Sequence, residues 1–184
     1  MVAVSLVTKP YTLWLTGYSG SGKSTIAYAL RQQFLMDGKA VYVIDGDHIR
    51  QGLNNDLGFS IEDRRENIRR VAEVAKLMNE AGLLVICALI SPISNDRELA
   101  RNIIDENSFL EIHIATSLAE CEKRDPKGLY RRARTGELKN FTGITSPYEA
   151  PLSPSMKIDT AQSTVNECVS QIKQKIGHVS SLTF

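Results

Sequence analysis

One eight-residue stretch limits the possible folds of this chain more than any other. The sequence GYSGSGKS at positions 17–24 follows the pattern G-x-x-x-x-G-K-[ST] of a phosphate-binding loop. Glycines in such a loop accept positive φ values, so that successive backbone N–H groups point inward at phosphate oxygens. Lys23 can then reach the β- and γ-phosphates of a nucleoside triphosphate, and the Ser24 hydroxyl can bind the Mg²⁺ ion that bridges them.

The sequence on either side of the loop provides the strand and the helix that this motif requires. An apolar run from Tyr11 to Thr16 precedes the loop, and a helical pattern with Ile26, Leu30 and Phe34 on one face follows it. A glycine-rich turn can match the pattern by chance, but this context makes nucleotide binding the better interpretation. The residues expected to bind the nucleotide are Gly17, Tyr18, Ser19, Gly20, Ser21, Gly22, Lys23, Ser24 and Thr25.

Length and composition narrow the class of protein. At 184 residues the chain is long enough to bury a full core, and we expect a single domain over 1–184. A net charge of +1 argues against binding to nucleic acid or a membrane surface, and no apolar run reaches membrane-spanning length. The opening Met1–Thr8 lacks the basic start and the cleavage-type ending of a secretory signal. Cys87, Cys121 and Cys168 are scattered without a C-x-x-C spacing, which indicates reduced thiols in a cytoplasmic protein.

Strand and helix patterns alternate along the rest of the chain. The unbroken apolar run Leu83–Ile90 is typical of a strand in a parallel sheet that is covered on both faces. Ser60 with Asp63 resembles a helix start, and Gly177 is expected to end the last helix. This order predicts an α/β fold with a doubly wound parallel sheet, whose ligands bind at the carboxyl ends of the strands. Further strands are expected over 40–44, 109–114 and 156–159, and helices over 60–82, 95–107 and 164–177, with a short helix from 117.

The segment 124–148 differs from the rest of the chain. It holds six basic residues and three glycines and has only weak periodicity, which predicts a mobile flap. Its cations suit a lid that closes over phosphates and excludes water. The alternative is an ordinary solvated surface.

Charged residues near the phosphate-binding loop could carry the chemistry. Asp45 and Asp47 follow a predicted strand and should lie beside the loop, where one carboxylate orients a hydroxyl and another group holds Mg²⁺. The expected metal-binding residues are Ser24 and Asp47. Arg50 and Arg64 suit an anionic acceptor, because guanidinium groups bind phosphate or sulfate well. The competing interpretations are a simple Asp-Gly-Asp turn and two solvated arginines.

Several distinctive blocks of sequence appear in a fixed order along the chain. They are Asp45-Gly-Asp47, Asp56-Leu-Gly-Phe-Ser60, Asp63-Arg64 with Glu66-Asn-Ile-Arg-Arg70, Ile90-Ser-Pro92, Arg124-Asp-Pro-Lys-Gly-Leu-Tyr130, Phe141-Thr-Gly-Ile144 and Tyr148-Glu-Ala-Pro151. Together these blocks resemble adenylyl-sulfate kinases over about residues 11–176. The resemblance implies a P-loop nucleoside-triphosphate kinase fold with a lid over about 124–148. It also implies transfer of the γ-phosphate of ATP, with Mg²⁺, to the 3′-hydroxyl of adenosine 5′-phosphosulfate.

The resemblance also implies roles for individual residues. Asp47 matches the catalytic aspartate of the family, and Lys23 and Ser91 complete the expected catalytic set. In some members the serine matching Ser91 has been described as a phosphoserine intermediate, but no neighbouring base for it is evident in this sequence. The residues expected to bind the acceptor are Asp47, Arg50, Phe59, Arg64, Asn67, Ile90, Ser91, Lys127, Gly128, Leu129 and Phe141.

One position departs from the family pattern. His48 stands where the family usually has asparagine after Asp-Gly-Asp, so an asparagine-specific contact is not expected here. The resemblance further implies a homodimer, a functional link to ATP sulfurylase, and a role in sulfate assimilation.

Three other functions are compatible with a phosphate-binding loop. The first is a kinase for a different small anionic acceptor, such as a nucleotide or a sugar phosphate. The second is a nucleotide-dependent switch: Asp125-Pro-Lys-Gly128 fits the D-x-x-G of GTPases, but the chain has no N-K-x-D motif. The third is a non-catalytic regulatory domain, against which the intact Lys23, Ser24 and Asp47 argue.

Overall fold

Five parallel strands form the centre of the computed structural model, which describes residues 10–180. Their order in space is β2-β3-β1-β4-β5, and each neighbouring pair is parallel. The α/β parallel-sheet fold predicted from the sequence is therefore confirmed, whereas the expectation for Met1–Thr8 lies outside the described residues. The strands are β1 (Thr12–Thr16), β2 (Val41–Asp45), β3 (Leu84–Ala88), β4 (Phe109–Ile114) and β5 (Met156–Ile158).

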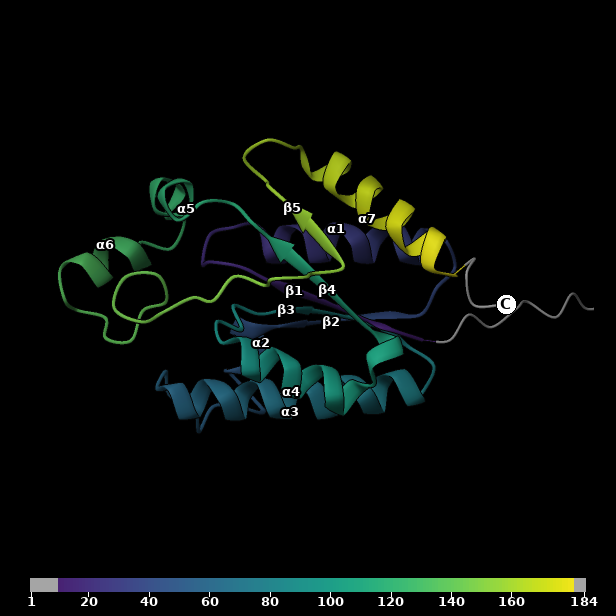
Figure 1. The fold of residues 1–184 in the computed structure, drawn as a ribbon, viewed down its shortest axis with the longest axis horizontal. Helices are drawn as coiled ribbons and strands as arrows, with labels where there is room; N and C mark the ends of the chain where they lie inside the picture. The colour runs from purple at the N-terminus through teal and green to yellow at the C-terminus, as the bar shows by residue number, and fades with distance from the viewer. Residues whose placement is uncertain (1–9, 181–184) are drawn as a thin grey trace, which may run out of the picture.

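Helices cover both faces of this sheet, as a doubly wound fold requires. Figure 1 shows α1 and α7 on one face and α3 and α4 on the other, with α5 and α6 at one end of the molecule. The helices are α1 (Lys23–Met36), α2 (Gly46–Ile49), α3 (Ile61–Glu80), α4 (Ser94–Ile104), α5 (Leu118–Arg124), α6 (Leu129–Arg134) and α7 (Val165–Ser180), and η1 (Glu106–Ser108) is a short 3-10 helix.

The side chains of β1 show why its sequence is apolar at successive positions. Leu13 and Leu15 join the core beneath α1 and α7, whereas Trp14 points to the opposite face and joins the core beneath α3 and α4. Successive residues of a strand alternate between the two faces, so a strand buried on both sides needs apolar residues throughout. The two cores pack against both faces of the sheet and so fix the positions of the carboxyl ends of its strands, where the functional groups lie.

The carboxyl ends of three neighbouring strands, β2, β3 and β1, lie at one edge of the sheet. The 17–24 loop follows β1, Asp45 ends β2, and Ser91 lies three residues beyond the end of β3. Neighbouring parallel strands with the order β2-β3-β1 bring these positions together. This is the edge at which ligands of doubly wound sheets bind.

The structure adds to or corrects three local points. Residues 46–49 form the short helix α2, not the plain turn of the competing interpretation, because the Asp45 carboxylate accepts a hydrogen bond from the backbone N–H of Asp47. The 124–148 segment contains α6, whose first turn is capped by the Asp125 carboxylate. α7 continues past Gly177 to Ser180, since an interior helix glycine costs only about 1 kcal/mol relative to alanine.

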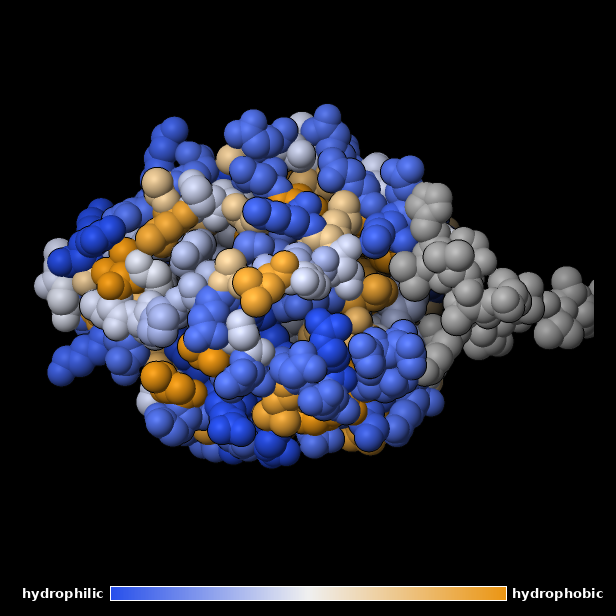
Figure 2. All heavy atoms as spheres, in the orientation of Figure 1, coloured by the Kyte–Doolittle hydropathy of each residue, from blue (hydrophilic) through white to orange (hydrophobic). Residues whose placement is uncertain are grey.

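The visible surface is mostly polar. In Figure 2, blue residues cover most of the face in view, and orange apolar residues occur in small separate groups. Within residues 10–180, none of the helices combines the length and apolar character needed to cross a membrane. Cys87, Cys121 and Cys168 are buried free thiols, as their scattered spacing predicts.

Candidate active site

The phosphate-binding loop has the backbone conformation that its sequence predicts. Gly17, Gly20 and Gly22 all have positive φ, and a Cβ atom on Gly17 would lie 2.5 Å from the carbonyl oxygen of Ile114. α1 begins at Lys23, within the last two residues of the loop. The N-terminal N–H groups of the helix therefore face the space that the loop encloses. The loop is thus a preformed anion-binding turn at the start of a helix.

Lys23 lies inside the curve of this loop. Its Nζ donates to the carbonyl oxygens of Gly17 at 2.9 Å and Tyr18 at 2.6 Å, and it lies 3.4 Å from Ser21 Oγ. Burial of the ammonium group lowers the pKa of Lys23 to about 8, because desolvation disfavours the charged form. An anion bound in the loop would restore the charge balance and favour protonated Lys23.

The carboxylates after β2 have different surroundings. Asp45 is buried, and its Oδ2 accepts a hydrogen bond from Ser24 Oγ at 2.6 Å while Oδ1 accepts from the N–H of Asp47 at 2.9 Å. The side chain of Asp47 is exposed, and its Oδ2 is contacted by the ammonium group of Lys127. The contact between Asp47 and Lys127 joins the sheet edge to the 124–148 segment.

These oxygen atoms suit Mg²⁺ bound together with phosphates. Magnesium in nucleotide sites takes one or two protein oxygens, and phosphate and water oxygens complete the octahedron. Ser24 is the last residue of the loop, and its Oγ donates a hydrogen bond to the Asp45 carboxylate. Asp47 lies two residues after Asp45, and its N–H donates to the same carboxylate. The described residues contain no cluster of three or more His, Cys, Asp or Glu side chains that could hold a metal ion.

A cavity of about 550 Å³ opens between the sheet edge and the 124–148 segment. Gly17, Tyr18, Ser21 and Gly128 do not line it, and their expected ligand contacts stay predictions. The predicted site residues that line the cavity are Ser19, Gly20, Gly22, Lys23, Ser24, Thr25, Asp47, Arg50, Phe59, Arg64, Asn67, Ile90, Ser91, Lys127, Leu129 and Phe141. Residues from the N-terminal half of the chain and from the 124–148 segment thus meet around one space.

Two arginines face this cavity without a carboxylate partner among the described residues. Arg50 donates to the carbonyl oxygens of Leu57 and Gly58, and its guanidinium carbon lies 4.5 Å from the centre of the Phe59 ring. Arg64 lies 5.3 Å from the same ring centre. Burial, with a smaller contribution from the neighbouring Arg50 charge, lowers the pKa of Arg64 to about 10. The two cations together form a positively charged wall that suits an anionic ligand.

Asn67 is held by a residue that the sequence patterns do not identify. Asn54 is fully buried, and its Nδ2 donates to Asn67 Oδ1 at 3.0 Å. Since this bond uses the carbonyl end of the Asn67 amide, its N–H groups are the end available for an acceptor oxygen. Asn54 lies in the irregular stretch after β2, where no periodicity marks it.

Ser91 has an unusual backbone conformation and no neighbouring base. Its φ is +39°, and its side chain is almost wholly buried. Ser91 Oγ accepts a hydrogen bond from Trp14 Nε1 at 3.1 Å, and indole N–H groups can only donate. No histidine or carboxylate is hydrogen-bonded to this hydroxyl among the described residues.

The 124–148 segment contacts the cavity at several points that sequence patterns do not identify. Arg64 Nη2 donates to the carbonyl oxygen of Asn140 at 2.9 Å, and the rings of Tyr130 and Phe141 meet edge to face at 5.0 Å. Tyr130 also donates through its hydroxyl to the carbonyl oxygen of Ser19. Lining residues that were not predicted include Arg132, Lys139, Asn140 and Thr142.

A smaller hollow of about 160 Å³ adjoins the phosphate-binding loop. It shares Gly22 and Thr25 with the large cavity and is otherwise lined by Ile26, Arg124, Thr160, Ser163, Val165 and Cys168. Arg124 donates to Thr160 Oγ1 at 2.7 Å and to the Thr160 carbonyl oxygen at 3.1 Å. The hollow therefore has one cationic wall and several apolar side chains beside the start of α1.

Comparison with known sequences agrees with this geometry. The family model for adenylylsulphate kinase matches residues 9–159. An adenylyl-sulfate kinase from Pseudomonas entomophila is 60% identical over 164 residues, which cover 89% of this chain and 79% of the relative. Another from Prochlorococcus marinus is 55% identical over 168 residues, covering 91% of this chain and 84% of the relative.

Solved structures give the same assignment. The Mycobacterium tuberculosis APS kinase in complex with AMPPNP and APS superposes with a TM-score of 0.89 and 43% identity, covering 92% of this chain and 98% of that one. A gluconokinase from Sinorhizobium meliloti gives a TM-score of 0.62 at 14% identity, covering 94% and 95% of the two chains. The second likeness shows a shared fold alone.

Proposed function

The chain belongs to the adenylyl-sulfate kinase family, and we propose that it transfers the γ-phosphate of ATP to the 3′-hydroxyl of adenosine 5′-phosphosulfate. The product is 3′-phosphoadenosine 5′-phosphosulfate, and the reaction belongs to sulfate assimilation. One observation supports the choice of acceptor: Arg50 and Arg64, neither of which forms an ion pair among the described residues, line the same cavity as the phosphate-binding loop. A neutral acceptor would leave the buried charge of Arg64 without a counter-ion.

The phosphate-binding loop has a simple role in this reaction. The backbone N–H groups of the loop and Lys23 bind the β- and γ-phosphates and stabilise the charge that develops during transfer. Asp45 fixes the Ser24 hydroxyl, and Ser24 and Asp47 are the side chains that would hold Mg²⁺. When bound, this ion neutralises phosphate charge.

Asp47 is the residue we assign to the acceptor hydroxyl. In-line transfer forms a bond between the acceptor oxygen and the γ-phosphorus as the bond to the leaving β-phosphate oxygen breaks, and the hydroxyl proton passes to the Asp47 carboxylate. The exposed Asp47 side chain lines the cavity. Its contact with Lys127 then gives way to the hydroxyl, and Lys127 becomes available to the phosphates.

The acceptor is held by groups on the other side of the cavity. Arg50 and Arg64 bind the phosphosulfate, and the free N–H groups of Asn67 donate to it. Phe59 and Phe141 offer aromatic surfaces to the adenine of the acceptor, with Ile90, Ser91, Lys127, Gly128 and Leu129 around them. The adenine of ATP fits the small hollow beside Arg124.

Ser91 acts through its position rather than as a nucleophile. Its hydroxyl is buried against Trp14, and no base that could remove its proton is hydrogen-bonded to it among the described residues. Incubation with γ-labelled ATP should accordingly leave Ser91 unlabelled. Stoichiometric label that is transferred to the acceptor on chase would contradict this role. The homodimer and the link to ATP sulfurylase stay predictions.

The acceptor assignment is tested by following ADP release from ATP and Mg²⁺ with different acceptors. We expect rapid release only with adenosine 5′-phosphosulfate. AMP lacks the sulfate, and adenosine lacks both the phosphate and the sulfate. Either acceptor would leave buried arginine charge unpaired. Loss of a charged hydrogen-bond partner costs about 2–5 kcal/mol, so the ratio kcat/KM should fall by roughly 30-fold or more.

The same panel separates the alternatives. A sugar phosphate or an unsulfated nucleotide that is phosphorylated as fast as adenosine 5′-phosphosulfate would place the chain with kinases of another acceptor. ADP release that is independent of every acceptor would indicate a nucleotide hydrolase. Binding of ATP without turnover under any condition would indicate a regulatory domain.

A further inference from the structure

A buried ion pair lies behind the acceptor side of the cavity. Arg97 of α4 and Glu111 of β4 are almost fully buried, and Arg97 Nε is 2.7 Å from Glu111 Oε1. Arg101, one turn further along α4, lies 3.3 Å from the other carboxylate oxygen of Glu111. Burying these charges is costly unless they are well paired, so Arg97 must have a specific set of partners.

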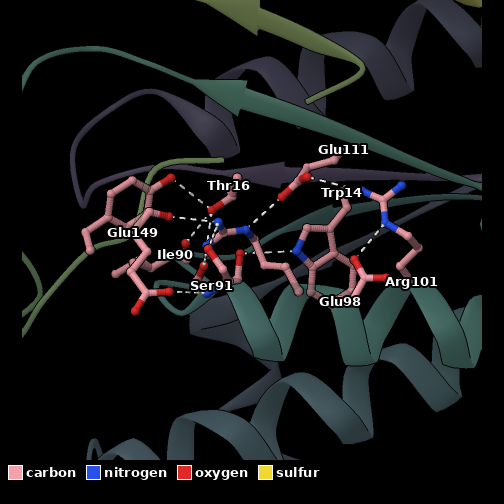
Figure 3. Close-up of polar contacts among 11 residues, drawn as sticks. Trp14, Thr16, Ile90, Ser91, Glu98, Arg101, Glu111 and Glu149 are labelled. Carbon is pink, nitrogen blue, oxygen red and sulfur yellow. Dashed lines mark hydrogen bonds and ion pairs between the residues drawn. The ribbon is translucent and has the colours of Figure 1, made fainter. Parts of the chain in front are cut away.

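The remaining N–H groups of Arg97 join two separate segments of the chain. Nη1 donates to the carbonyl oxygen of Ser91 at 2.8 Å, and Nη2 donates to the carbonyl oxygen of Glu149 at 2.8 Å. Ser91 belongs to the loop after β3, whereas Glu149 directly follows the 124–148 segment. Figure 3 shows Ser91, Glu149 and Glu111 around one guanidinium group. The dashed lines that meet there are the hydrogen bonds from Arg97 to these three residues.

Glu149 is attached to the same loop by two further hydrogen bonds. Its N–H donates to the carbonyl oxygen of Pro92 at 2.8 Å, and its Oε2 accepts from the N–H of Ser94 at 2.7 Å. The hydroxyl of the preceding Tyr148 lies 3.1 Å from Thr16 Oγ1. The end of the 124–148 segment is therefore docked onto the stretch that begins at Ser91 and leads into α4.

We propose that Arg97 is a positioning residue that fixes the spacing between the two walls of the acceptor site, with Glu149 as its counterpart on the 124–148 segment. One wall is formed by Ile90, Ser91 and Pro92, and the other by residues 138–142. The positive φ of Ser91 is a strained conformation that needs support from its surroundings, and the bond from Arg97 supplies it. This inference rests on the proposed function, since the acceptor occupies that site.

The first test compares Arg97→Lys with a matched control, Arg101→Lys. Both variants keep a positive charge beside Glu111, but a lysine ammonium cannot reproduce the fork with which Arg97 reaches Ser91 and Glu149. Arg101 contacts Glu111, Glu98 and the Phe109 ring, and neither carbonyl oxygen. We expect Arg97→Lys to raise the KM for the acceptor by roughly tenfold, the loss expected for a charged hydrogen bond. The KM for ATP should change by less than about twofold in both variants.

The second test uses the exposed residue Glu149, whose substitution does not disturb the core. Glu149→Ala removes the oxygen that accepts from Ser94, and we expect a rise in acceptor KM of about fivefold. Glu149→Gln retains an amide oxygen in the same place and should restore most of the loss. A residue that only supports the fold would lower the melting temperature without this split between the two KM values.

The two possible failures can be told apart. Equal acceptor KM values in Arg97→Lys and Arg101→Lys, with both proteins folded, would overturn the role of Arg97. If the wild-type protein fails to phosphorylate adenosine 5′-phosphosulfate, the proposed function fails instead. Amide hydrogen exchange over residues 138–148 then still tests the attachment: it should be faster in Arg97→Lys than in Arg101→Lys, and equal rates would contradict it.

Discussion

Replacing Lys23 with alanine should lower kcat by about two to three orders of magnitude while the fold is retained, as is typical when one charged contact to the transition state is lost. Lys23 Nζ lies inside the curve of the loop, bonded to two loop carbonyl oxygens, where the transferred phosphate would sit. Removing the buried ammonium group costs the empty protein little stability, because desolvation opposes its charge. Steady-state turnover with saturating ATP and acceptor, together with circular dichroism, measures both expectations.

A second readout isolates the charge of Lys23. Its pKa of about 8 in the empty protein should rise when phosphates bind, so ATP binding takes up a proton above pH 8. ATP affinity should therefore fall by about tenfold from pH 7 to pH 9 in the wild type. Calorimetry in buffers of different ionisation enthalpy detects this proton uptake, which Lys23→Ala should lack and the exposed Lys76→Ala should keep. Turnover near the wild-type value in Lys23→Ala would exclude the assigned role.

Replacing Arg64 with methionine should raise the KM for adenosine 5′-phosphosulfate by roughly 30- to 150-fold, since losing one partner of a desolvated charge pair costs about 2–3 kcal/mol. Arg64 is buried against the cavity and lacks a carboxylate partner among the described residues, so its charge is available to the acceptor. The KM for ATP should change little, because ATP binds at the phosphate-binding loop. Initial rates with each substrate varied in turn measure the two constants.

A neighbouring arginine provides the control. Arg65 is next in sequence, but its side chain is exposed and does not line the cavity; it lies 3.9 Å from Asp96. Arg65→Met should leave both KM values within about twofold of the wild type, as expected for a weak surface ion pair. A similar rise in the two KM values for Arg64→Met would mean that Arg64 supports the site as a whole and does not hold the acceptor.

Local sequence patterns were sufficient for most of the fold. The loop pattern at 17–24 requires a strand and a helix, and β1 and α1 lie where it predicts them. The cap formed by Ser60 with Asp63 is present at the start of α3, because such caps involve neighbouring residues only. α6 was not predicted, since so short a helix has too few residues to show periodicity. The end of α7 was predicted incorrectly, since a single glycine need not stop a helix.

The sequence by itself determined the parts of this protein that depend on nearby residues: the phosphate-binding loop, the sheet edge where it lies and the family-specific blocks around it. Only the tertiary structure decided how those parts are held together. Arg64 reaches a carbonyl oxygen 76 positions away, and Arg97 reaches one 52 positions away. The partners in both contacts are backbone oxygens, which every residue carries, so no side-chain pattern marks them. They become specific only when the packing of α3 and α4 against the sheet brings Arg64 to the cavity wall and Arg97 behind it.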